Sequence, residues 1–129
     1  MSAEEFDRLV ERAYARIPRR FRKRLHNLAV LVEDEPTAAQ LGSAGVRRGG
    51  TLLGLYQGRP LTERSVFEPF AMPDRITIFQ GPHERLARSP AHLESLVADT
   101  IWHEVAHYFG MGERRVRAAE ARRRGRLRG

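Results

Sequence analysis

Apolar positions near the start of the chain recur every three or four residues, which gives a helix one apolar face. Within residues 3–17 these positions are Phe6, Leu9, Val10, Ala13, Tyr14 and Ile17. The spacing predicts an amphipathic helix. Pro18 ends it, because proline lacks the N–H that a helix interior needs.

Three short apolar segments, residues 27–32, 51–56 and 75–80, have the length and composition of strands. The first is followed by acidic residues and Pro36, and it is predicted to be a buried strand. The alternative structure for residues 27–32 is a second helix that ends near Val32.

Helices are predicted on either side of the second and third strands. Residues 37–41 follow Pro36 and precede Gly42, so they predict a short helix that Gly42 stops. Residues 58–73, marked by glycine and prolines, are predicted to be a long loop. After the third strand, Pro90 fits the first turn of a helix over residues 91–110.

The 129 residues suffice for one ordinary domain and are too few for two domains with a linker. The apolar share of 41% and the low aromatic share of 8% are typical of a small soluble domain. Together with the pattern of helices and strands, this predicts the α+β (α/β mixed) class.

The net charge of +7 is concentrated at the C-terminal end. Residues 114–129 contain eight arginines and one acid, Glu120, whereas residues 1–113 contain 15 basic and 15 acidic side chains. We therefore predict a domain over residues 1–113 and an arginine-rich tail over residues 114–129 that is frayed or disordered. Nucleic acid is not an expected partner, except through the basic tail.

The chain contains no cysteine, so any metal site must use histidine and carboxylate ligands. The N-terminal stretch lacks an apolar signal core, and the longest apolar run, residues 28–32, is too short to cross a bilayer. These features predict a cytoplasmic protein without a membrane partner.

Residues 103–113, HEVAHYFGMGE, carry the most informative motif. His103 and His107 lie about 40° apart around a helix, so both imidazoles can face one ion from successive turns. Glu104 projects beside them and can act as the general base of metal-assisted hydrolysis without being a ligand.

Gly110 can adopt the left-handed conformation that ends a helix and folds the chain back. Glu113 then becomes the candidate third ligand, and three protein ligands with one open position define a catalytic zinc site. The hypothesis is that His103, His107 and Glu113 bind Zn²⁺. The other histidines, His26, His83 and His92, belong to no motif and are predicted to lie on the surface.

The chain resembles the minimal zincin-like metallopeptidases of bacteria. The resemblance extends from HEVAHYFG to VEDEP at 32–36, LLGLYQGRPLTER at 52–64 and MPDRITIFQGP at 72–82. It implies a small mixed sheet packed with helices, metal ligands at His103, His107 and Glu113, and a catalytic Glu104. Zincin peptidases bind substrate along an edge strand, and residues 75–80 are the candidate for that strand; the alternative is a core strand without substrate contact.

The predicted function is zinc-dependent hydrolysis of a peptide or flexible protein segment. One alternative is a non-catalytic zinc-binding or interaction module, in which the metal only joins the helix end to a loop. A second is a zinc-dependent ribonuclease, because ribosomal-RNA maturation proteins space three ligands similarly. Glu104 and the neutral charge of residues 1–113 argue against the ribonuclease.

Overall fold

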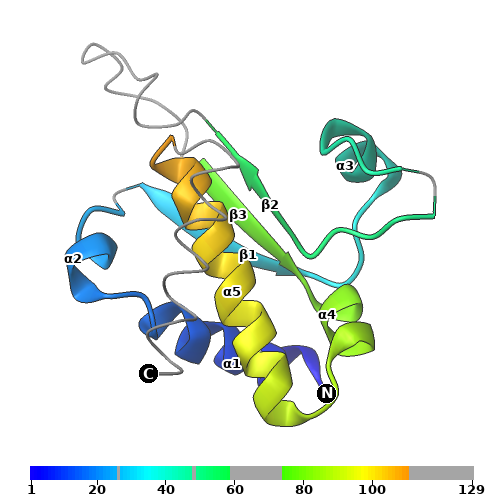
Figure 1. Ribbon diagram of the computed structural model, residues 1–129, viewed down its shortest axis with the longest axis horizontal. Coiled ribbons are helices and arrows are strands. Elements are labelled where there is room, and N and C mark those ends of the chain that lie inside the picture. Colours follow the sequence, from blue (N-terminus) through cyan, green and yellow to red (C-terminus); the bar gives the residue numbers. More distant parts are fainter. Residues whose placement is uncertain (26, 48, 59–73, 111–129) are drawn as a thin grey trace, which may run out of the picture.

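The computed structural model describes residues 1–25, 27–47, 49–58 and 74–110. The described helices and strands are interspersed along the chain, as Figure 1 shows. In order, they are α1 (Ala3–Ala15), α2 (Arg19–Arg22), β1 (Leu28–Glu33), α3 (Ala38–Ser43), β2 (Gly54–Gln57), β3 (Asp74–Phe79), α4 (Gln80–Leu86) and α5 (Pro90–Tyr108). The predicted α+β class is confirmed.

The described strands form one mixed sheet in the order β1-β3-β2. β1 runs parallel to β3, with Leu28 opposite Asp74, and β2 runs antiparallel to β3, with Gly54 opposite Ile78. The alternative that residues 27–32 are helical is therefore wrong. β3 is the central strand, so the prediction that residues 75–80 form the substrate-binding edge strand is also wrong.

The core lies where α1 and α5 pack against the sheet (Figure 1). Its members are fully or almost fully buried apolar side chains from α1, β3 and α5, among them Phe6, Leu9, Ile76, Ile78, Val97 and Ile101. β1 is only half-buried, and Leu31 is 42% exposed. The prediction of a buried first strand is wrong because β1 lies at an edge of the sheet.

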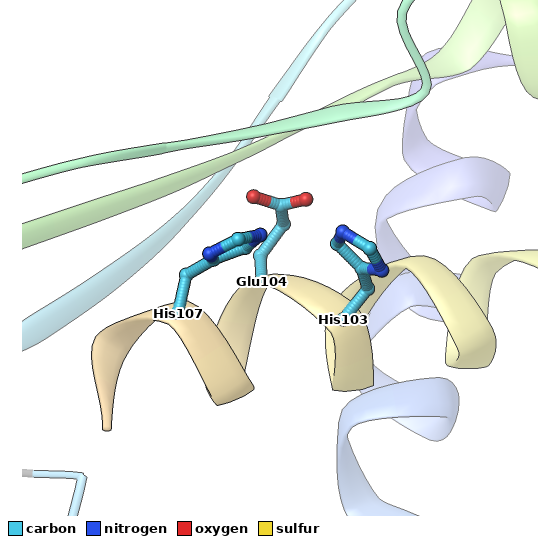
Figure 2. A group of neighbouring side chains, drawn as sticks. All are labelled: His103, Glu104 and His107. Carbon is cyan, nitrogen blue, oxygen red and sulfur yellow. The ribbon is translucent and has the colours of Figure 1, made fainter. Parts of the chain in front are cut away.

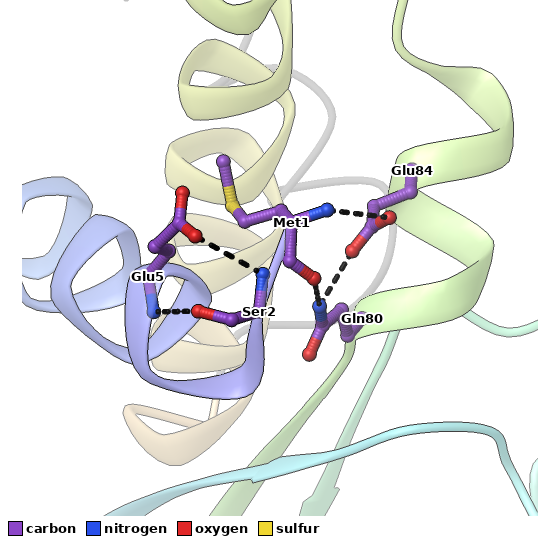
Figure 3. Close-up of polar contacts among 5 residues, drawn as sticks. All are labelled: Met1, Ser2, Glu5, Gln80 and Glu84. Carbon is purple, nitrogen blue, oxygen red and sulfur yellow. Dashed lines mark hydrogen bonds and ion pairs between the residues drawn. The ribbon is translucent and has the colours of Figure 1, made fainter.

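The start of α1 is held by two sets of polar contacts (Figure 3). Ser2 caps the helix by accepting from the Glu5 backbone N–H, and the Glu5 carboxylate accepts from the Ser2 N–H in return. The Gln80 side chain, at the start of α4, donates to the Met1 carbonyl oxygen at 3.0 Å. These contacts fix α1 to the segment that follows the central strand.

Several predicted boundaries differ from the observed ones by one to three residues, and the second strand begins at Gly54 instead of residue 51. Thr37 caps α3 in a capping box with Gln40, and Gly42 lies inside this helix instead of stopping it. Gln80 begins α4 instead of ending β3. Among the residues that the structure describes, no helix is long and apolar enough to cross a membrane.

Candidate metal centre

α5 is the helix that positions the motif. Ser89 caps its start by accepting from the His92 backbone N–H, and Pro90 occupies the first turn, where its missing N–H is not needed. Four large side chains of the helix are buried: Val97, Ile101, Val105 and Tyr108 are at most 1% exposed. Their burial orients the helix and leaves the histidines on another side.

His103, Glu104 and His107 form a cluster on this helix (Figure 2). The potential ligand atoms of the three side chains lie within 4.8 Å of one another. The two imidazole rings are 5.0 Å apart between centroids and inclined by 61°. All three side chains point to the same side of α5, which is the arrangement that a single cation requires.

A groove of about 420 Å³ lies beside this cluster. Its lining includes residues 51–54, which lead into β2, and Leu86 of α4. α5 supplies the remaining lining residues, Leu96, Asp99, Thr100, His103 and Glu104. Glu104 is only 9% exposed, so its carboxylate faces the groove and not open solvent.

Gly54 allows β2 to approach α5 at this point. A Cβ at Gly54 would lie 2.6 Å from Thr100 Cγ2 and 3.4 Å from Glu104 Cγ. Any side chain there would press on the helix turn that carries Glu104. This glycine therefore sets the spacing between the edge strand and the cluster.

The end of α5 agrees with the sequence prediction as far as the described residues reach. Phe109 is the C-cap, and Gly110 has a φ of 77°, in the left-handed region. Glu113 lies outside the described residues, so its assignment as third ligand stays a prediction. The same holds for residues 114–129 and for His26.

His83 corrects the prediction that the remaining histidines are surface residues. It is fully buried, with Nδ1 2.8 Å from the Phe79 carbonyl oxygen and Nε2 2.8 Å from Thr100 Oγ1. Because the carbonyl can only accept, Nδ1–H donates to Phe79. The Thr100 hydroxyl also donates to the Leu96 carbonyl oxygen at 3.0 Å, so its one proton is shared between that oxygen and His83 Nε2. Burial lowers the pKa of His83 below its ordinary value, and the hydrogen bond to Phe79 opposes this in part.

The sequence interpretation missed two groups of residues around the cluster. Asp99 lines the groove and stands four residues before His103, a helical spacing that was readable from the sequence. Residues 51–54 are distant in sequence from α5, and no local pattern marks them as neighbours of Glu104.

Comparison with known proteins agrees with this geometry. The family model for zincin-like metallopeptidases matches residues 25–123. A solved structure of a conserved hypothetical protein from Thermus thermophilus is similar to this chain, with 26% sequence identity and a TM-score of 0.56, over 84% of this chain and 94% of the other. No curated protein matches. The family match covers most of the chain, including the three strands and the histidine helix, and the chain therefore belongs to the zincin-like metallopeptidase family.

Proposed function

We propose that this protein is a zinc-dependent metallopeptidase in which His103, His107 and Glu113 hold the metal and Glu104 is the general base. The observation that carries the proposal is the cluster on α5, whose ligand atoms lie within 4.8 Å of one another. Its position at a groove gives a reacting bond a place to lie next to Glu104.

The donor set fits zinc. Two imidazoles and carboxylate oxygens are ligands that Zn²⁺ accepts readily, and the chain has no thiolate to favour a softer metal. When bound, zinc lowers the pKa of a coordinated water towards 7 and polarises the carbonyl of the bond to be cleaved.

Glu104 is placed to move the proton in this reaction. Its carboxylate stands beside both imidazoles and is largely shielded from solvent, where electrostatic interactions are stronger than in bulk water. We expect it to accept a proton from the attacking water and to pass it to the amine that leaves.

The substrate is proposed to lie along β2. β2 is an edge strand of the described sheet, since β3 pairs with it on one side only, and residues 51–54 line the groove beside Glu104. An extended peptide can add to such an edge by backbone hydrogen bonds. This assigns to β2 the role that the sequence suggested for residues 75–80.

The proposal is tested by measuring bound metal and peptide cleavage together. Elemental analysis of purified protein should find one zinc in the wild type and in Glu104→Gln, and none in His103→Ala. A degenerate peptide library should be cleaved by the wild type only, because loss of a general base slows such reactions by about 10²- to 10⁴-fold.

His92→Ala is the matched control, because His92 lies near the start of the same helix but outside the cluster. It should retain both zinc and cleavage. Zinc in every variant, including His103→Ala, would contradict the ligand assignment. Zinc without cleavage in the wild type would favour a non-catalytic module.

A further inference from the structure

The groove beside Glu104 is lined in part by leucines. Leu52 and Leu53 line it ahead of β2, Leu96 lines it from α5, and Leu86 lines it from the end of α4. Three elements that are separate in sequence thus bring leucines to one place, next to the proposed general base.

Leu86 is one of three large apolar side chains that are exposed among the described residues, and it is 51% exposed. A leucine that faces water next to other partly buried leucines gains free energy when an apolar ligand covers it. The groove volume of about 420 Å³ lies within the range of ligand sites in proteins.

The charges of the groove narrow the choice of ligand. Asp99 and Glu104 both line it, and the described residues of its lining include no lysine or arginine. A charged side chain would lose its hydration among the leucines of this lining and find no lysine or arginine there as a partner, whereas a large aliphatic side chain would bury leucine surface.

We propose that this groove is a specificity subsite that takes a large apolar side chain of a peptide, next to the bond that is cleaved. The inference rests on the proposed peptidase function and adds the substrate class to it. The groove is continuous with the cluster, because His103 and Glu104 belong to its lining. A side chain seated there places its own peptide bonds within reach of Glu104.

Binding of short peptides tests the subsite without relying on catalysis. The probes are acetyl-Ala-Ala-Xaa-Ala-Ala-amide peptides with a fluorescent label, in which Xaa is leucine, glycine, aspartate or lysine. Fluorescence anisotropy with zinc-loaded Glu104→Gln should show leucine binding about tenfold to a hundredfold more tightly than glycine, and more tightly than aspartate or lysine.

A pair of leucine variants shows whether the groove is responsible. Leu86→Asp, made in the Glu104→Gln background, should reduce the preference for leucine over glycine by at least about fivefold. Leu31→Asp is the matched control, because Leu31 is 42% exposed on β1 and lies outside the groove. It should keep the preference.

The outcomes separate the subsite from the peptidase proposal. A preference for leucine that Leu86→Asp abolishes supports the subsite, even if the zinc-loaded wild type cleaves no peptide and the peptidase proposal fails. Equal binding of leucine and glycine, tighter binding of lysine, or a preference that Leu86→Asp leaves unchanged would overturn the subsite, whether or not peptides are cleaved.

Discussion

At the scale of single residues, Gly54 is a position where one added methyl group should disturb the packing beside the cluster. Gly54→Ala places a methyl group 2.6 Å from Thr100 Cγ2 and 3.3 Å from the Thr77 carbonyl oxygen. We expect the free energy of unfolding to fall by about 1–3 kcal/mol, as for other overpacked sites. Urea denaturation measures this loss.

Gly42→Ala is the matched control for Gly54→Ala. Gly42 lies in α3, and a Cβ there would meet no atom within 4 Å. Because alanine is the better helix former, this variant should be as stable as the wild type or more stable by about 0.5–1 kcal/mol. A Gly54→Ala variant as stable as Gly42→Ala would show that the strand can shift away from α5 without loss.

The site residues divide into those that the sequence could identify and those that it could not. His103, Glu104 and His107 lie within five residues of each other on one helix, so helical geometry alone brings them together. The burial of His83 depends on α4 packing against α5, and its partner Thr100 is 17 positions away. No local pattern distinguishes such a histidine from a surface one.

At the scale of elements, His83 joins the end of β3, α4 and α5, and its protonation should weaken that junction. Because its pKa is lowered in the folded protein, the unfolded chain binds a proton that the folded chain does not. The contribution of neutral His83 to the free energy of unfolding is therefore fully present above the unfolded pKa of 6.5. It falls as the pH drops towards the folded pKa. The slope should be at most about 1.4 kcal/mol per pH unit.

Urea denaturation of the wild type and of His83→Gln between pH 8 and pH 5 measures this effect. Between pH 6.5 and 5, the free energy of unfolding of His83→Gln should fall less steeply than that of the wild type. At pH 8 this variant is also expected to be less stable than the wild type. His92→Gln, at the start of α5, is the control and should keep the wild-type slope. If the pH dependence of stability in His83→Gln equalled that of the wild type, protonation of His83 would not be what weakens this junction.

The order of the strands was the part of the element pattern that the sequence interpretation missed. Ile76, Thr77, Ile78 and Phe79 are all buried, so β3 is covered on both faces as a central strand is. In the sequence, polar and apolar residues alternate over residues 75–78, so no local pattern marked this strand as central. The edge position of β2 depends on pairings between distant segments, which spacing along the chain does not reveal.

At the scale of the whole molecule, α1 is part of the core although it lies before the family match, which begins at residue 25. Phe6 is fully buried and belongs to the same cluster as Ile78 and Val97. Phe6→Ala should reduce the free energy of unfolding by about 3–5 kcal/mol, through lost apolar burial and the cavity left behind. Thermal unfolding followed by circular dichroism measures it.

Arg12→Ala on the same helix is the control for Phe6→Ala. It removes a 2.8 Å ion pair with Glu94 of α5, but the Arg12 side chain is 60% exposed. An exposed pair contributes at most about 1 kcal/mol, so this variant should remain close to the wild type. If both variants lost the same stability, α1 would be held by its surface charges and not by its apolar face.

The parallel pairing of β1 with β3 has a consequence for the kinetics of folding. Leu28 meets Asp74 only after the chain has passed through α3 and β2. The pairing of β1 with β3 therefore requires a long loop to close before the two strands make any contact. Local contacts form quickly in helices such as α1 and α5, whereas such distant pairings are slow. The groove needs β2 in place, and β2 needs β3, so the binding surface is expected to be among the last parts of the protein to form.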